Sequence, residues 1–126
     1  MAFRMEKQKT TSTPYILIDE EKGYMKIEGR SFHENIIEFF TEVDKWLDSY
    51  LMTNFNTFIF DCVMDYFNSS TVKALLNMIS KMDKYSVNGN NVIVNWITSE
   101  GNEIIIEIGE DFKEDIQNLN FNLVIN

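Results

Sequence analysis

The feature that most constrains the fold is an alternation, in the second half of the chain, between β-rich apolar runs and segments with helical periodicity. Strand-like runs cover 55–64, 92–97 and 121–125, and the segments between them, 69–85 and 103–116, place apolar residues at helical spacing. Parallel strands need long crossover connections of this kind, usually helices. The alternation therefore predicts an α/β domain with a mostly parallel mixed sheet and packed helices.

The first half of the chain adds a hairpin and one more helix. Short strands are predicted over 15–19 and 24–28, and the few residues between them favour an antiparallel hairpin. Ser31 and Glu34 have the spacing of a capping box, so we expect a helix to start there and to continue through the following apolar positions. The predicted order is ββαβαβαβ in a single domain covering 14–126.

Three further expectations concern particular segments. Residues 1–13 are polar and basic, and we expect them to form a disordered lead-in to the domain. The run from Phe55 to Met64 is apolar at nearly every position, which is typical of a strand covered on both faces. A turn is expected at 88–90, where Asn-Gly-Asn separates a helix from the next strand.

Charge and cysteine content disfavour several classes of partner. The chain has 20 acidic and 11 basic residues, a formal net charge of −9, which argues against nucleic acid and membranes as partners. The single cysteine, Cys62, lies in an apolar run, and we expect a buried, unreactive thiol. The first residues lack the apolar core of a signal peptide and no apolar run is long enough to span a bilayer, so we expect a cytoplasmic protein.

Few residues are suited to catalysis. The sequence contains no glycine-rich phosphate loop and no cluster of His and Cys that would ligate a metal. His33 is expected to be an exposed residue of the first helical turn. Asp61 and Asp65 form an acidic pair, but such pairs arise by chance in a small acidic chain. We therefore expect no cofactor and no enzyme activity; a carboxylate-based enzyme or ligand-binding domain is an alternative that requires a deep pocket around this pair.

The most unusual local feature is the helix start at Asn68-Ser69-Ser70-Thr71. Asn, Ser and Thr are preferred N-cap residues, so a purely structural cap is one interpretation. A single cap residue would suffice, however, and here three hydroxyl residues follow the asparagine. The free amides and the positive dipole end of a helix also favour a phosphate, so phosphorylation there would add charge without breaking the helix. The local sequence leaves both interpretations open.

Four segments, in this order, resemble the SiaC family of bacterial regulatory phosphoproteins. They are Ile27–Asn35, Tyr66–Lys73, Val94–Trp96 and Gly109–Phe112. The resemblance extends over residues 13–125 and implies a fold similar to STAS domains, the fold of anti-sigma-factor antagonists. The family's phosphorylated threonine follows the asparagine of an Asn-Thr-Ser-Ser motif, and that position is Ser69 in this sequence.

The resemblance implies a partner-switching pathway. A kinase with a histidine-kinase-like ATPase fold and a PP2C-type phosphatase would act on Ser69. The unphosphorylated protein would bind and stimulate a diguanylate cyclase, raising cyclic di-GMP and favouring biofilm, and phosphorylation would release the cyclase. We expect Asn68 to shape the cap, and Ser70, Thr71 and Lys73 to form the docking rim. A related alternative is an anti-anti-sigma factor that acts on transcription through the same switch.

The sequence departs from the family pattern at two positions. Serine stands in place of the threonine at Ser69, so Ser70 and Thr71 stay open as competing phosphoacceptors. His33 occupies a place where family members usually carry proline, a change that should only soften the start of the helix.

Overall fold

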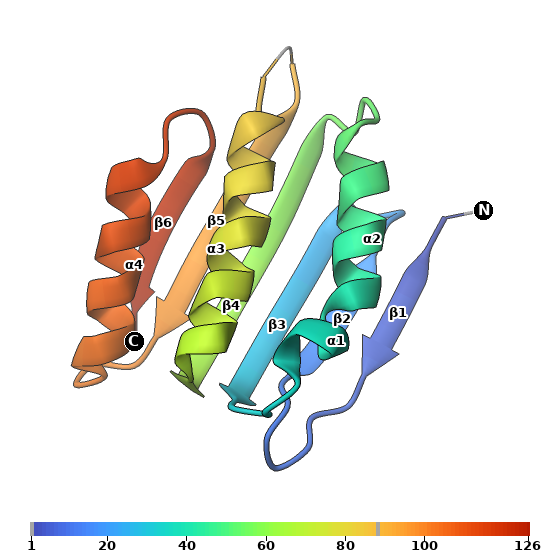
Figure 1. Ribbon diagram of the computed structural model, residues 1–126. Coiled ribbons are helices and arrows are strands. Elements are labelled where there is room, and N and C mark those ends of the chain that lie inside the picture. Colours follow the sequence, from blue (N-terminus) through green and yellow to red (C-terminus); the bar gives the residue numbers. More distant parts are fainter. Residues whose placement is uncertain (1, 88) are drawn as a thin grey trace.

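The molecule is a six-stranded mixed sheet with all its helices on one face (Figure 1). The computed structural model describes residues 2–87 and 89–126. The strands are β1 (Arg4–Lys7), β2 (Tyr15–Asp19), β3 (Tyr24–Ser31), β4 (Thr57–Phe67), β5 (Asn91–Thr98) and β6 (Asn120–Ile125). The helices are α1 (Ile36–Phe39), α2 (Thr41–Leu51), α3 (Ser69–Lys84) and α4 (Glu103–Asp115).

The strands lie in the sheet in the order in which they occur in the chain. The first three strands pair antiparallel, and β3, β4, β5 and β6 pair parallel. The predicted mostly parallel mixed sheet, the hairpin of the second and third strands, and the helical assignment of 103–116 are confirmed. The predicted turn at 88–90 includes Asn88, which lies outside the described residues.

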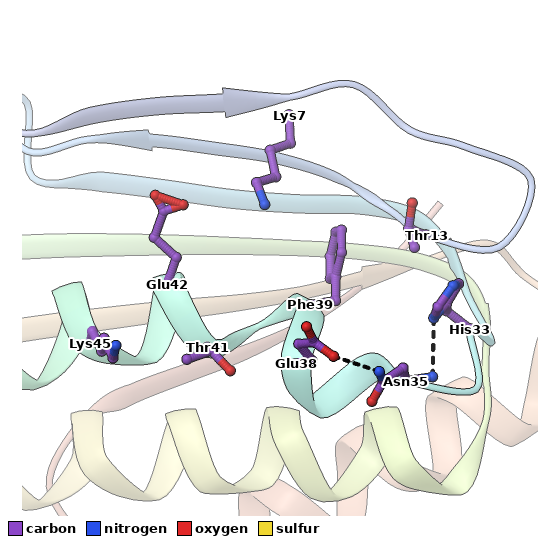
Figure 2. Close-up of a pocket in the computed structure, with 9 residues that line it drawn as sticks. All are labelled: Lys7, Thr13, His33, Asn35, Glu38, Phe39, Thr41, Glu42 and Lys45. Atoms are coloured by element: carbon purple, nitrogen blue, oxygen red, sulfur yellow. Dashed lines mark hydrogen bonds between the residues drawn. The ribbon is translucent and has the colours of Figure 1, made fainter.

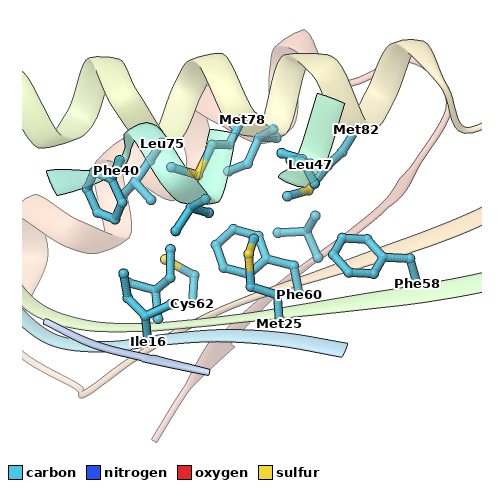
Figure 3. Close-up of a cluster of buried hydrophobic side chains, with 14 of the residues drawn as sticks. Ile16, Met25, Phe40, Leu47, Phe58, Phe60, Cys62, Leu75, Met78 and Met82 are labelled. Atoms are coloured by element: carbon cyan, nitrogen blue, oxygen red, sulfur yellow. The ribbon is translucent and has the colours of Figure 1, made fainter. Parts of the chain in front are cut away.

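The core lies between the sheet and the helices, because every second strand residue points to the covered face. In β4, Phe58, Phe60 and Cys62 are at most 1% exposed, and Leu75 and Met78 of α3 are fully buried above the sheet (Figure 3). The expectation of a buried thiol is confirmed, and burial raises the pKa of Cys62 far above its ordinary value. These side chains hold α3 across the middle of the sheet.

The prediction that the run 55–64 is covered on both faces is wrong. The residues of β4 alternate between buried and partly exposed, so Ile59, Asp61 and Val63 lie on a face that no helix covers. The apolar Ile59 and Val63 on this open face gave the run its uninterrupted hydrophobic character. A strand that carries apolar residues on both of its faces therefore looks, in sequence, like a strand that is covered on both faces.

The prediction of a disordered segment over residues 1–13 is also wrong. Strand β1 pairs antiparallel with β2 from Arg4 opposite Asp19 to Lys7 opposite Ile16. Its only buried side chain is Met5, so the strand is held mainly by backbone hydrogen bonds and carries charges along the sheet edge. Hydrophobic patterning cannot detect a strand of this composition.

The first helix begins later than predicted, and the capping box does not form. Strand β3 continues to Ser31, which is fully buried, and Glu34 is exposed in the loop that follows. The helical region starts at Ile36 and is divided at Phe40, so the predicted single helix is two consecutive helices. Ser31 has a different hydrogen-bond partner, which belongs to the candidate site.

Candidate functional site

The start of α3 follows directly on β4, at the carboxyl end of the parallel strands. The side chain of Asn68 caps the helix: its Oδ1 accepts hydrogen bonds from the Thr71 amide at 3.0 Å and from the Thr71 hydroxyl at 2.8 Å. The Thr71 Oγ1 also lies 2.7 Å from the Ser31 Oγ, and the amide of Asn68 donates to the Ser31 carbonyl at 3.0 Å. One asparagine and one threonine thus tie the helix start to the end of β3.

Thr71 does not belong to the docking rim that the sequence predicted. Its side chain is fully buried, and its hydroxyl is engaged by Asn68 and Ser31. The threonine instead supports the cap from below, since a buried hydroxyl needs a partner and finds two here. Because it is buried, Thr71 is also less accessible to a kinase than Ser69 or Ser70.

Ser69 occupies the first position of α3 and is exposed, whereas Ser70 is half-buried. In the described part of the chain, neither hydroxyl has a hydrogen-bond partner, and the amides of both residues lack an acceptor, as expected for a first helical turn. Lys73 is exposed one helical turn after Ser69. The arrangement places a free hydroxyl, free amides and a cation together at the end of the helix.

Ser70 and Lys73 also line a groove between α3 and the two preceding helices. The groove has a volume of about 340 Å³ and includes the exposed Ile37 and the carboxylate of Asp44. One oxygen of Asp44 is buried without a hydrogen-bond partner, and burial is the main cause that raises the pKa of this carboxyl. The sequence did not single out either residue, because neither belongs to a motif and the groove forms only where α3 packs beside the preceding helices.

His33 lies in the loop before α1 rather than in a helical turn, and it is exposed as predicted. Its Nδ1 accepts a hydrogen bond from the Asn35 amide at 3.0 Å (Figure 2). It lines a hollow of about 580 Å³ between β1 and the helices α1 and α2, in which Lys7 and Glu38 bring charges of both signs. The hollow does not include the start of α3.

The acidic pair of the sequence analysis is not assembled as an acid–base site. Asp61 accepts hydrogen bonds from the Tyr24 hydroxyl at 2.7 Å and from the Asn95 side chain at 2.8 Å on the open face of the sheet. Burial, followed by this contact with Asp61, raises the pKa of Tyr24 well above its ordinary value. Asp65 is exposed near the end of β4. One carboxylate is thus part of a cross-strand ladder and the other faces solvent.

Two kinds of site are not found among the described residues. No group of three or more His, Cys, Asp or Glu side chains in 2–87 and 89–126 is arranged to hold a metal ion. In the same part of the chain, no helix combines the length and the apolar character needed to cross a bilayer.

Comparison with known proteins identifies the family. The model of the SiaC family of regulatory phosphoproteins matches residues 7–126. A protein of Pseudomonas aeruginosa strain UCBPP-PA14, named only as uncharacterized, is 30% identical over 106 residues, which is 84% of each chain.

Solved structures agree with this assignment. SiaC of P. aeruginosa is 25% identical with a TM-score of 0.88, over 98% of this chain and 99% of that one. The activator SiaC in the crystal structure with the diguanylate cyclase SiaD of P. aeruginosa is 27% identical with a TM-score of 0.89, over 97% and 99% of the two chains. The family match spans β2 to β6 and the last residue of β1. The chain belongs to the SiaC family of regulatory phosphoproteins.

Proposed function

We propose that this protein is a phosphorylation-controlled activator of a diguanylate cyclase, and that Ser69 is the phosphoacceptor. The unphosphorylated helix start binds the cyclase, and phosphorylation of Ser69 releases it. A kinase with a histidine-kinase-like ATPase fold adds the phosphate and a PP2C-type phosphatase removes it. The protein itself carries no catalytic residues in this scheme.

The observation that carries the proposal is the division of roles among the residues of the helix start. Asn68 and Thr71 use their side chains to cap and anchor α3, whereas Ser69 is exposed and has no hydrogen-bond partner in the described residues. A hydroxyl that the fold does not need is the one that a kinase can reach and modify without unfolding the helix.

The physical effect of the phosphate follows from its position. It would add a charge of about −1.5 to −2 at neutral pH to a helix end whose free amides can donate hydrogen bonds to the phosphate oxygens. Lys73, one turn later, would add a favourable charge on the helix. The modified helix therefore stays folded while its outer surface changes sign and size, which is sufficient to remove a docked partner.

The choice of partner is supported by the relatives. One of the similar SiaC structures is the activator in a complex with the diguanylate cyclase SiaD, and the match covers 99% of that SiaC chain. The similarity covers 97% of this chain at a TM-score of 0.89, which supports a partner of the same class.

Intact-mass and peptide analysis after incubation with the cognate kinase and ATP tests the acceptor. We expect one phosphate on Ser69 and none on the Ser69→Ala variant. Ser80→Ala is the matched control, because Ser80 is an exposed serine later in the same helix and its loss should leave phosphorylation unchanged. Phosphate on Ser70 alone, with Ser69→Ala modified normally, would contradict the assignment.

Cyclic di-GMP synthesis by the purified cyclase tests the output. Unphosphorylated protein should raise the rate of synthesis, whereas the phosphorylated protein and Ser69→Asp should not. Ser80→Asp adds the same charge two turns or more away from the helix start and should stimulate normally. Equal stimulation by Ser69→Asp and the wild type would show that charge at this position does not control the cyclase.

A further inference from the structure

An arginine and two aromatic rings form an exposed stack at the end of the sheet that carries Ser69. The guanidinium carbon of Arg30 lies 5.7 Å from the ring centroid of Phe32 and 5.4 Å from that of Tyr66. The two rings meet edge to face, with centroids 5.9 Å apart and an interplanar angle of 67°. We call Arg30, Phe32 and Tyr66 the arginine–aromatic patch.

The patch is exposed although its members are large. Phe32 is 36% and Tyr66 46% accessible, and Arg30 is exposed as well. Arginine and aromatic residues are the types that most often carry binding energy in protein interfaces. Stacking on the rings also holds the guanidinium in one orientation, which lowers the entropy lost when it binds.

The patch is joined to the helix start by short connections. Arg30 lies opposite Tyr66 in the pairing of β3 with β4, after a register shift at Gly29. Ser31, between Arg30 and Phe32 in the chain, is the residue whose hydroxyl meets Thr71 under the first turn of α3. The patch and Ser69 therefore lie at the same end of the sheet on a shared hydrogen-bonded support.

We propose that the arginine–aromatic patch is the anchor for an acidic segment of the cyclase that binds the unphosphorylated helix start. The inference rests on the proposed function and names the chemistry of its partner surface. It assigns to Arg30 the role of binding a partner carboxylate, and to the two rings the role of packing against apolar side chains next to that carboxylate.

Charge is the argument for an acidic occupant. A hollow of about 440 Å³ beside the patch is lined by two cations, Lys9 and Arg30, and by one carboxylate, Asp65. Neither cation forms an ion pair within the described residues, although the whole chain has a net charge of −9. An excess of unpaired positive charge at this place fits a partner carboxylate, which arginine binds through two parallel hydrogen bonds.

The same chemistry gives the sign of the switch. A phosphate on Ser69 would stand near the approaching acidic segment and repel it, while its own charge would compete for the nearby cations. Phosphorylation would thus oppose binding through charge as well as through size.

Titration of the purified cyclase with protein variants, in low and in moderate salt, tests the inference. We expect Arg30→Gln to weaken binding about tenfold or more and to reduce its salt dependence. Tyr66→Ala should weaken binding by a similar factor, and Arg30→Lys should recover only part of it because lysine lacks the planar group. Circular dichroism on each variant shows whether it is folded.

Arg4→Gln is the matched control. Arg4 is exposed and lies opposite Asp19 in the strand pairing of β1 with β2, at the other end of the sheet. Its substitution makes the same change in net charge far from the patch. It should alter binding by less than about threefold.

The outcomes separate the two proposals. If the wild type binds no cyclase, the proposed function is overturned, and with it the cyclase segment assigned to the patch. If the wild type binds and the two glutamine variants behave alike, the patch is not the anchor. If Arg30→Gln binds normally but no longer responds to Ser69 phosphorylation, then Arg30 holds the phosphate of the chain itself, and the assignment of an acidic partner segment is overturned.

Discussion

The two ends of the sheet use aromatic residues in opposite ways. Where β3 begins, Trp46 stacks on Tyr50 with ring centroids 4.8 Å apart and donates its indole N–H to Glu20 at 2.7 Å. Both rings are 7% exposed. Where β3 ends, Phe32 and Tyr66 contact each other but stay 36% and 46% exposed.

The difference separates stability from recognition. We call the end where β3 begins the closed end. There Trp46 and Tyr50 each contact several other rings, so the fold itself removes their apolar area from water. At the end that carries Ser69, Phe67 is buried against Trp96, but the rings of Phe32 and Tyr66 keep much of their area exposed. Substitutions at the two ends should therefore affect different measurements.

The largest expected effect is at the closed end. Trp46→Ala should lower the free energy of unfolding by about 3–5 kcal/mol, because a buried indole and its contacts are lost. Tyr66→Ala at the other end should cost less than about 1 kcal/mol, since much of its ring already faces solvent. Urea unfolding followed by circular dichroism measures both. Equal losses at the two ends would remove the distinction.

A smaller effect is expected within the helix start. Thr71→Val should lower the free energy of unfolding by about 1–3 kcal/mol, because it leaves buried polar partners at Asn68 and Ser31 unsatisfied. Ser69→Ala should change it by less than about 0.5 kcal/mol, as its hydroxyl bonds to nothing in the described residues. If both variants lost the same stability in chemical unfolding, the separation of cap and acceptor would be wrong.

The smallest effect concerns Asp44 in the groove beside Ser70. Burial raises the pKa of the Asp44 carboxyl, so this group binds a proton more tightly in the folded protein than in the unfolded chain. The charged form therefore lowers stability at neutral pH, and this cost disappears as the pH falls through the raised value to the ordinary carboxyl range. The side chain is 36% exposed, so water screens much of the effect.

Asp44→Asn should accordingly raise the melting temperature by about 1–2 °C at pH 7. The gain should shrink as the pH falls and be lost at about pH 3, below the ordinary aspartate pKa of about 3.9, where the carboxyl is protonated in the folded and the unfolded state. Thermal unfolding at the two pH values measures it. Asp111→Asn is the control, because Asp111 is an exposed carboxylate of α4 and does not line the groove that contains Asp44. If Asp44→Asn raised the melting temperature equally at both pH values, the gain would not come from the protonation of Asp44.

The elements that could be predicted from the sequence are those whose pattern of apolar and polar residues matches their pattern of buried and exposed positions. Helix α3 and strand β5 have one buried stripe and one buried face, so periodicity located them to within about two residues. Strand β1 was missed because backbone pairing to β2, rather than side-chain burial, holds it. The open face of β4 was missed because it carries isoleucine and valine.

The candidate site shows a similar limit. The helix start was found because its residue types are unusual, but the sequence could not assign separate roles to its hydroxyls. Ser31 looked like the cap of the nearest helix, whereas it supports a helix 40 positions later in the chain. Contacts at this separation depend on which strand ends meet, and local spacing contains no information about that.

The pairing of Thr71 with Ser31 and Asn68 has a consequence for the substitutions that position 69 can accept. Because the cap and its anchor depend on other residues, the exposed first position of α3 is free to exchange one hydroxyl amino acid for another without cost to the fold. As far as the fold is concerned, the side chain at position 69 can therefore change between serine and threonine. Position 69 tolerates substitution because Asn68, Thr71 and Ser31 keep the start of α3 in place.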